Sequence, residues 1–503
     1  MRISIPAGLA AIALALAVPT AAFGAQPNAA AASCIASGDV AGITAALSGQ
    51  GAAAVLCPSA VFDLTSPVAF TAANQQIYTQ GLPTGSTRAS LVVTGSGQSS
   101  AITGANESGI TIENIQVNGN RPALGRIASG SSALIEIGGN ASGQAVQNVY
   151  AYETRGWSTI HITEGTVTNS TPACQSAKIL NNTFAEAGTD ASGTWADGIS
   201  LACGNSEVEN NTVNDATDGG IVVFGAPGST ISGNTITSLT ENELGGINMV
   251  DYSPMNGNYT GTVVKNNVID GKSALIKVGI AMGPQVWGCG TGTNYGGTVT
   301  GNVVEGENVA YGYAVNGVTN WTVTGNSDTA RHVGVTSSSG CGGTPASPAA
   351  YLVDSATSST LQSQFVSTTQ LEYLLGVSEP SILTVPQAPT ACGVMTANQG
   401  LYPGQSLASC DGRFTLDMQG DGNLVLYFNG AALWASNTSG HSAGEALMQG
   451  DGNFVVYDAT GTPDWSSGTT NNSGAKLDLQ NDGNLVVYSS SGAALWTSNT
   501  GGH

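Results

Sequence analysis

Asp197 and Asp218 stand 21 residues apart, and each lies just before a Gly-Ile dipeptide. Two such carboxyl groups can serve as the general acid and the general base on either side of a glycosidic bond. Crowding makes this division of roles feasible, because it raises the pKa of one carboxyl group and leaves its neighbour ionised. Asp-Gly is also a common turn dipeptide, so the alternative is that both aspartates only hydrogen-bond turns.

Further candidate residues surround these two aspartates when the Gly-Ile dipeptides are aligned. Glu243 and Asp251 are additional candidate catalytic acids, with hydrogen bonding of turns again as the alternative. Trp157 and Trp195 have flat apolar faces on which sugar rings can stack. The other candidate substrate-binding residues carry a guanidinium, an imidazole and an amine: Arg155, His161 and Lys277.

These side chains need a scaffold of regularly spaced elements, and an asparagine repeat is the first sign of one. The steps between successive asparagines are 34, 34, 29, 23, 33, 35 and 24 residues. Short steps fit one coil of a parallel β-helix, and long steps fit a coil with an added loop. A recurring asparagine can adopt left-handed dihedrals at a turn, or stack as an amide ladder. The repeat consists of Asn114, Asn148, Asn182, Asn211, Asn234, Asn267, Asn302 and Asn326.

A second short strand follows in many coils and often opens with Gly-Ile. We align these strands on Ile160, Ile199, Ile221, Ile247 and Ile280. Because apolar residues alternate along them, each strand is expected to turn one side toward a common core. Adjacent coils stack about 4.8 Å apart, so equivalent positions form columns. The alignment places Asp197 and Asp218 on neighbouring coils, displaced by about one residue.

The coil pattern resembles the pectate-lyase-like superfamily of right-handed parallel β-helix proteins, over roughly residues 34 to 375. Members of that superfamily are mostly polysaccharide hydrolases, lyases and epimerases, with non-catalytic adhesins among them. The resemblance implies an all-β fold that handles a glycan, and it rests on the coils and not on a full catalytic signature.

The segment from Trp195 to Ile199, followed by Asp218, is similar to the polygalacturonase family, in which Asn-Thr-Asp precedes an Asp-Asp pair one coil later. Ala196 replaces the threonine, and Gly219 stands where the second aspartate would be. The sequence contains neither a Gly-His-Gly nor an Arg-Ile-Lys segment. These departures argue against polygalacturonase activity and leave a hydrolase acting on another, neutral glycan.

A polysaccharide lyase is the runner-up, and a non-catalytic glycan-binding or surface protein is the third alternative. A lyase needs a base that removes a proton next to a carboxylate, often with calcium neutralising that carboxylate. Asp197, Asp218 and Asp251 could supply oxygen ligands to calcium, and no other cofactor or metal site is predicted. The candidate bases are Arg155, Lys277, Arg331 and His332.

A sharper repeat occupies the end of the chain, in three copies of Gln-x-Asp-x-Asn-x-Val-x-Tyr spaced 30 and 31 residues apart. Side chains alternate along a strand, so the five named residues share one face. That face carries amide, carboxylate and phenol groups suited to sugar hydroxyls, beside a small apolar surface. Leu426, Val456 and Val487 should point inward instead. The tryptophans that follow the copies should fill a shared core: Trp434, Trp465 and Trp496.

This repeat resembles the bulb-type, monocot mannose-binding lectin family, over about residues 390 to 503. The family folds as a β-prism with pseudo-threefold symmetry, and all three copies match it at all five positions. The alternative is a repeat that keeps the fold while its sites no longer bind. The resemblance implies binding of mannose-type sugars by Gln419, Asp421, Asn423, Val425 and Tyr427, by Gln449, Asp451, Asn453, Val455 and Tyr457, and by Gln480, Asp482, Asn484, Val486 and Tyr488.

Charge and targeting signals narrow the function further. The 503 residues include 33 acidic and 12 basic side chains. Nucleic acid and anionic membranes require clustered cations, so neither is an expected partner, and a polyanionic substrate is disfavoured. Residues 1–25 have the pattern of a secretory signal peptide, with Arg2 before an apolar run that is too short to span a bilayer comfortably.

We therefore predict a secreted, all-β protein in which a β-helix glycoside hydrolase is targeted by a mannose-binding-like domain. The expected parts are a signal peptide (1–25), a parallel β-helix (30–376), a proline-containing linker (377–391) and a β-prism (392–503). The oligomeric state is not predicted. Eight cysteines in an exported chain suggest disulfides. Pairing in chain order is our hypothesis: Cys34–Cys57, Cys174–Cys203, Cys289–Cys341 and Cys392–Cys410.

Overall fold

The computed structural model describes residues 33–127, 132–189, 194–290, 292–332, 341, 346, 348–376, 389, 391–397, 399–441, 443–458 and 462–503. The predicted signal peptide, residues 1–25, lies outside the described residues, and so does most of the predicted linker, residues 377–391. Among the described residues, no helix is long and apolar enough to cross a membrane.

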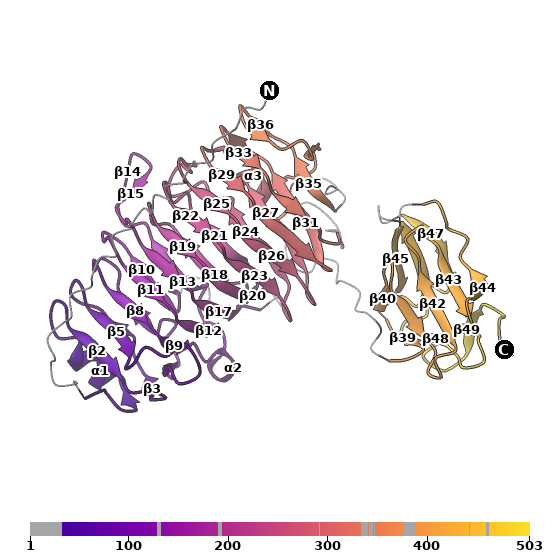
Figure 1. Ribbon diagram of the computed structural model, residues 1–503, viewed down its shortest axis with the longest axis horizontal. Helices are drawn as coiled ribbons and strands as arrows, with labels where there is room; N and C mark the ends of the chain where they lie inside the picture. Colours follow the sequence, from indigo (N-terminus) through magenta and orange to yellow (C-terminus); the bar gives the residue numbers. More distant parts are fainter. Residues whose placement is uncertain are drawn as a thin grey trace, which may run out of the picture.

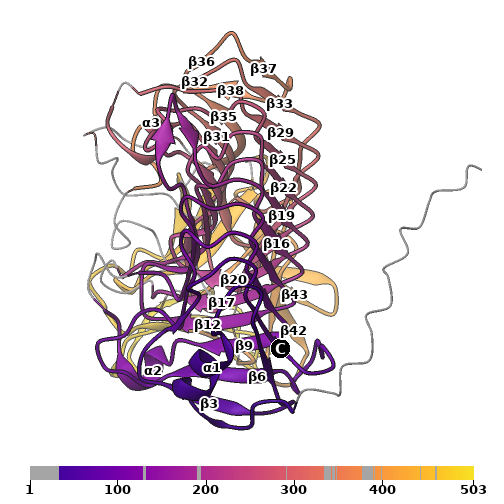
Figure 2. The same cartoon turned by 90° about the vertical axis from the view of Figure 1, so that its left-hand side faces the viewer.

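Successive coils of the chain each give one strand to three parallel sheets of 11 strands, which together form a β-helix (Figures 1 and 2). Sheet A contains β2 (Ala53–Leu56), β5 (Gln76–Thr79), β8 (Thr111–Glu113), β11 (Ala145–Gln147), β16 (Lys178–Leu180), β19 (Glu207–Glu209), β22 (Thr230–Ser232), β25 (Val263–Lys265), β29 (Thr298–Thr300), β33 (Thr322–Thr324) and β37 (Thr360–Leu361). Sheet B contains β1 (Gly38–Asp39), β3 (Val61–Leu64), β6 (Ala89–Val93), β9 (Ile115–Asn118), β12 (Tyr150–Thr154), β17 (Thr183–Ala187), β20 (Thr212–Ala216), β23 (Thr235–Ser238), β26 (Val268–Gly271), β30 (Val303–Gly306) and β34 (Ser327–Asp328). Sheet C contains β4 (Val68–Ala69), β7 (Ile102–Thr103), β10 (Ile135–Gly138), β13 (Ser158–Thr163), β18 (Asp197–Leu201), β21 (Gly219–Val223), β24 (Glu243–Met249), β27 (Ile276–Met282), β31 (Val309–Val315), β35 (Ala349–Val353) and β38 (Val366–Ser367).

Short elements are added to these coils. The first helix begins after Asp39, whose carboxylate accepts a hydrogen bond from Ala41 N at 3.0 Å and caps the helix. The additions are the helices α1 (Val40–Ala46), α2 (Arg121–Leu124) and α3 (Pro284–Trp287), the hairpin of β14 (Val167–Thr168) and β15 (Thr171–Pro172), and a small parallel sheet of β28 (Asn294–Tyr295), β32 (Val318–Thr319) and β36 (Ala356–Thr357).

The predicted isoleucine column is confirmed, because the aligned isoleucines are paired from coil to coil and fully buried in the core. The glycine that precedes four of the five isoleucines, all except Ile160, allows the coils to approach. A Cβ atom on Gly198 would lie 2.4 Å from Val213 Cγ1 and 2.6 Å from Gly220 O. A side chain at this position would therefore collide with the core, which explains why Gly-Ile recurs.

Six of the predicted asparagines form a buried ladder at the turn between sheets A and B. Each side-chain Nδ2 donates to the Oδ1 atom of the next asparagine at 2.9 Å. Each Nδ2 also reaches a backbone carbonyl, as Asn234 does with Val208 O at 2.9 Å. Because buried polar groups need partners, the ladder holds neighbouring coils in register. It consists of Asn182, Asn211, Asn234, Asn267, Asn302 and Asn326.

Asn114 and Asn148 have a different role from the ladder. Both adopt left-handed backbone dihedrals, with φ of 51° and 54°. The same conformation occurs directly before ladder residues, for example at Asn181 and Asn210 with φ of 56°. The asparagine repeat in the sequence therefore combines two adjacent positions of the turn. Both predicted roles of asparagine occur, the left-handed turn residue and the amide ladder.

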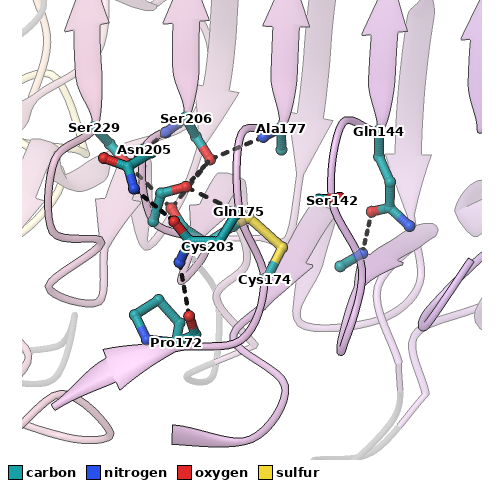
Figure 3. Close-up of a disulfide and its surroundings, with 12 residues drawn as sticks. Ser142, Gln144, Pro172, Cys174, Gln175, Ala177, Cys203, Asn205, Ser206 and Ser229 are labelled. Atoms are coloured by element: carbon teal, nitrogen blue, oxygen red, sulfur yellow. Dashed lines mark hydrogen bonds between the residues drawn. A yellow bond between two sulfur atoms is a disulfide. The ribbon is translucent and has the colours of Figure 1, made fainter. Parts of the chain in front are cut away.

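All four predicted disulfides are formed. Cys174 and Cys203 join adjacent coils, and their Cα atoms are 4.8 Å apart, as expected for neighbours in a stack (Figure 3). Beside them, Gln175 Nε2 donates to Pro172 O at 2.7 Å, and Asn205 Nδ2 donates to Gln175 Oε1 at 2.5 Å (Figure 3). This disulfide therefore fixes the chain just beyond β18, the strand that carries Asp197.

The C-terminal domain consists of three antiparallel sheets of four strands. Trp434, Trp465 and Trp496 meet edge to face with ring centroids 5.2–5.5 Å apart, which confirms their shared packing. The first sheet contains β41 (Ser406–Ala408), β42 (Phe414–Met418), β43 (Leu424–Phe428) and β44 (Ala431–Ala435). The second contains β40 (Gln399–Leu401), β45 (Ala443–Met448), β46 (Phe454–Asp458) and β47 (Pro463–Ser466). The third contains β39 (Val394–Met395), β48 (Lys476–Leu479), β49 (Leu485–Tyr488) and β50 (Ala494–Thr497).

The ladder predicts a strong effect of a single amide. Asn234→Ala removes two acceptor and two donor interactions from the buried turn. We expect the free energy of unfolding to fall by about 2–4 kcal/mol, because buried groups of Asn211 and Val208 lose their partners. Denaturant unfolding measures the loss, with the exposed Thr322→Ala as control, for which less than about 0.5 kcal/mol is expected. Equal midpoints for the two variants would contradict the stabilising role of the ladder.

Candidate carbohydrate sites

An acidic cluster lies on the outer side of sheet C. Ile199 and Leu201 are buried in the core, so Ser200 between them points outward. Ser200 Oγ donates to Asp197 Oδ2 at 2.6 Å, which places the Asp197 carboxylate on the same side. Because Ile199 pairs with Ile221 on the next coil, Gly219 lies beside Asp197, and Asp218 is displaced by one residue. The aligned positions of the two aspartates are therefore as predicted.

Burial raises the pKa values of this cluster, and the charge of Asp218 adds to the rise at Asp197 and Asp251. Burial raises the pKa of Asp197 well above its ordinary value, and the charge of Asp218 is the next cause. Burial also raises the pKa of Asp218 to about 6. The pKa of Asp251, which follows β24, is raised to about 7 by burial and then by Asp218. The structure thus brings Asp197, Asp218 and Asp251 together as groups that hold protons at unusually high pH.

Arg126 joins this cluster and was not identified from the sequence. Its guanidinium donates to the backbone carbonyl of Trp195, and its charge opposes the rise in the pKa values of Asp197 and Asp218. Arg126 comes from the loop between β9 and β10, two coils before β18. Because this loop lies outside every aligned strand, the repeat pattern contained no signal for it.

Trp157 and His161 border the acids on the preceding coil. His161 pairs in register with Ser200, the residue that donates to Asp197. His161 Nδ1 lies 2.9 Å from Glu136 Oε1, and its ring meets Trp157 edge-on with centroids 4.7 Å apart. Glu136 is a further neighbour that the sequence analysis missed, because it lies on yet another coil. Trp195 packs against an apolar cluster that includes Leu244.

Three other predicted site residues are sealed away from solvent. Glu243 is 0% exposed, and its Oε1 accepts a hydrogen bond from Ala216 N at 3.2 Å. Lys277 is also 0% exposed, and burial lowers its pKa to about 7. Arg155 is 2% exposed, and its guanidinium donates to five backbone carbonyls. These side chains do not reach a surface at which a polysaccharide could bind, so we leave them out of the candidate site.

The remaining candidate bases of a lyase have partners. Arg331 stacks on the ring of Tyr402, and His332 Nε2 lies 3.2 Å from Asp328 Oδ1. Within the described ranges, no group of three or more His, Cys, Asp or Glu residues is arranged to hold a metal ion.

The three motif copies of the C-terminal domain form three equivalent polar sites: site 1 (residues 419–427), site 2 (449–457) and site 3 (480–488). In each, the Gln Nε2 donates to the Tyr hydroxyl, at 2.7, 2.5 and 2.8 Å respectively. The Asp carboxylate accepts from the backbone N–H of the Asn two residues later, at 3.0–3.1 Å. Each site is thus a set of oriented donors and acceptors held together before a ligand arrives.

Comparisons with known proteins give two separate similarities. Residues 173–328 match the family model described as the right handed beta helix region. Curculin-2 from Molineria latifolia is 42% identical over 69 residues, which are 14% of this chain and 42% of that protein. The mannose-specific lectin of Galanthus nivalis is 46% identical over 63 residues, 12% of this chain and 40% of the lectin. The chain therefore spans less than half the length of either relative.

A solved monocot mannose-binding lectin from Gastrodia elata has 40% sequence identity and a TM-score of 0.21, covering 22% of this chain and 98% of that one. The family match and the curated lectins agree with the stacked parallel sheets and with the threefold motif described above. The chain joins a right-handed parallel β-helix to a bulb-type lectin domain.

In the lectin domain, residues just after each tryptophan fix the motif asparagine, and the sequence analysis did not identify them. Asn423 Oδ1 accepts from Ser436 Oγ at 3.1 Å and from Thr438 N at 3.2 Å. Serine and threonine repeat these contacts in sites 2 and 3. Because Oδ1 is occupied, Nδ2 is the group of each asparagine that can serve a ligand. As expected, Leu426, Val456 and Val487 pack in the core of the domain. The motif valines Val425, Val455 and Val486 lie outside that core cluster but are only 2–3% exposed.

The acidic cluster predicts a stability that falls as the pH rises. Because the pKa of Asp218 is about 6 in the folded chain against 3.8 normally, its protonation stabilises the fold below about pH 4, and this contribution is lost as the pH passes 6. Asp218→Asn removes this titration. We expect the melting temperature of the variant, measured by calorimetry, to exceed that of the wild type at pH 8 and to equal it near pH 4. The exposed Asp63→Asn serves as control, and identical pH profiles of wild type and Asp218→Asn would contradict the burial of an ionised Asp218.

Proposed function

We propose that the chain is an exported glycoside hydrolase whose β-helix cleaves a polysaccharide and whose lectin domain binds mannose-type glycans. The observation that carries the catalytic part is the cluster of Asp197, Asp218 and Asp251, whose pKa values are raised by burial, with the charge of Asp218 adding to the rise at the other two. General acid catalysis near neutral pH needs a carboxyl group that keeps its proton there. The four disulfides suit an extracellular protein.

The two central acids take different roles in this proposal. Asp197 has the more strongly raised pKa, with both Asp218 and Asp251 contributing, so it holds a proton and acts as the general acid. Asp218 ionises above about pH 6, with Arg126 favouring its charged form, and acts as the general base. Protonation of the glycosidic oxygen by one group and activation of water by the other would cleave the bond.

A neutral glycan fits these surroundings best. The chain carries a net charge of −21, and Arg126 is the cation that acts on the acid pair, so a polyanion would be repelled. Trp157, held edge-on against His161, offers an apolar ring face beside the acids for a sugar to stack on. Ring contact and hydroxyl hydrogen bonds would position the substrate without charge pairing.

The lectin domain supplies the targeting part of the proposal. Its three sites repeat the same Gln, Asp, Asn and Tyr geometry, and the Galanthus nivalis relative is named a mannose-specific lectin. Holding the chain at a glycan surface raises the local concentration of substrate at the β-helix, so weak individual sites suffice.

A non-catalytic glycan-binding protein is the second candidate. The observation in its favour is the small exposure of Asp197, 3%, and its hydrogen bond from Ser200. The lyase is less well supported, because Arg155 and Lys277 are buried.

The catalytic proposal predicts a large loss of activity without either acid. The wild type is incubated with plant, fungal and bacterial polysaccharides, and reducing ends and the ultraviolet absorbance of unsaturated sugar ends are followed. On the substrate that yields reducing ends, Asp197→Asn and Asp218→Asn should each reduce the rate by about 10²–10⁴-fold. Asp63→Asn, on the far sheet B, should retain full activity. Full activity of both acid variants would refute the assignment, absorbance would indicate a lyase, and inactivity of the wild type on every substrate would favour the binding protein.

The lectin proposal predicts that binding resides in the motif carboxylates. A chain carrying Asp421→Ala, Asp451→Ala and Asp482→Ala should lose at least about ten-fold in affinity for yeast mannan and for methyl α-mannoside, because each site loses acceptor oxygens for the sugar. Isothermal titration of the full chain measures both ligands, with Asp63→Asn as control. Unchanged mannan binding by the triple variant would remove the lectin sites from the proposal.

A further inference from the structure

The three sugar sites of the lectin domain differ at one position beside the motif tyrosine. The residue paired with that tyrosine on the adjacent strand is Thr415 in site 1, Glu445 in site 2 and Lys476 in site 3. Directly opposed residues of an antiparallel pair lie on the same face, with Cβ atoms about 4.5–5.5 Å apart. This position therefore borders the sugar on the same face as the tyrosine.

In site 2, this bordering residue, Glu445, lies near a residue of the β-helix, Arg331. Burial raises the pKa of Glu445, while the charge of Arg331 and a hydrogen bond from Tyr402 oppose the rise. Arg331 follows β34 at the end of the β-helix, and it also lies 3.4 Å from Glu307. The carboxylate beside site 2 is therefore linked to an arginine of the other domain.

Tyr402 completes this link between the domains. It belongs to the lectin domain, directly after β40, yet it is 4% exposed and packs in the apolar cluster on the outer side of sheet C. Leu371 and Leu374 belong to the same cluster, and Arg331 stacks on the Tyr402 ring. Figure 1 shows β40 and β45, two strands of the sheet that carries site 2, on the side of the lectin domain that faces the β-helix.

Leu401 pairs with Ala446 and is buried in the core of the lectin domain, so the next residue, Tyr402, lies beside Glu445 on the opposite face, which also carries Tyr457. Because Tyr402 packs with residues of the β-helix, the β-helix lies against that face and not against the back of the sheet. Glu445 and Tyr457 also act on each other electrostatically: the pKa of Tyr457 is raised by burial and then by the charge of Glu445. The counterpart in site 3 has a different surrounding, since Lys476 is 44% exposed in its side chain and pairs with Asp478 of its own strand.

We infer that site 2 is a composite glycan site, in which Arg331 and Tyr402 hold the end of the β-helix against one side of the sugar-binding face. Site 2 admits a terminal mannose-type unit or a short unbranched oligosaccharide and excludes a branched polymer, whereas sites 1 and 3 accept both. This inference rests on the proposed sugar binding by the lectin domain.

Chains with one intact site test the inference. Asp421→Ala with Asp482→Ala leaves site 2, and Asp451→Ala with Asp482→Ala leaves site 1. Both chains are titrated with methyl α-mannoside and with branched yeast mannan. The ratio of mannan affinity to methyl mannoside affinity should be at least about ten-fold lower for the site 2 chain, because the β-helix restricts access to bulky ligands.

Arg331→Ala is then added to each chain. In the site 2 chain it should raise mannan affinity by about ten-fold and change methyl mannoside affinity by less than about three-fold, since it releases the wall and leaves the motif intact. In the site 1 chain, Arg331→Ala should change neither the mannan affinity nor the methyl mannoside affinity, which also verifies that the variant folds. If Arg331→Ala disturbs folding, Glu445→Thr, which copies site 1, tests the same contact and should have the same effect.

The outcomes separate this inference from the proposed function. If neither chain binds methyl α-mannoside, the proposed sugar binding fails. If both bind it and their mannan ratios are equal, or if Arg331→Ala and Glu445→Thr leave the ratio of site 2 unchanged, the composite site is wrong while the lectin function stands.

Discussion

The stacking of one coil on the next is the constraint on which the rest of the β-helix depends. Parallel strands hydrogen-bond at about 4.8 Å, and each repeated feature is fitted to that spacing. The amide ladder, the close approach at Gly198 and the Cys174–Cys203 bridge all join equivalent positions of successive coils. The same spacing brings Asp197 and Asp218 onto neighbouring coils, where the charge of Asp218 raises the pKa of Asp197. The coil spacing that stabilises the β-helix therefore also places these two carboxyl groups near each other.

The lectin domain uses repetition differently, since its three sheets converge on the tryptophans and do not stack along an axis. Threefold repetition copies each sugar site with the serine and threonine that fix its asparagine. Individual character then comes from positions outside the motif. The residue opposite the motif tyrosine is such a position, since it is Thr415, Glu445 or Lys476 in the three sheets.

Features that recur along the chain could be predicted from the sequence, and features that do not recur could not. The isoleucine column and the lectin motif follow from spacing, because every coil or sheet must satisfy the same packing rule. The disulfide order was a hypothesis that the structure confirms. Arg126 and Glu136 could not be predicted, because they come from other coils than the acids. Arg126 acts on Asp197 and Asp218, and Glu136 contacts His161. Periodicity also did not indicate that Glu243 and Lys277 are fully buried. Glu243 pairs in register with the core residue Ile276, and its carboxylate accepts a hydrogen bond from Ala216 N.

Arg155 has a consequence for the chemistry of the acids even though it lies far from solvent. Its guanidinium gathers the carbonyl oxygens of Gly95, Ser96, Gln98, Leu124 and Gly125, in the manner of an internal cross-brace. Arg126 directly follows Gly125 in the chain, so the hydrogen bonds of Arg155 help to fix the position from which the Arg126 charge acts on Asp197 and Asp218. The protonation of these carboxyl groups therefore depends on a contact in the protein interior, and a change at Arg155 would shift their pKa values without altering a carboxylate.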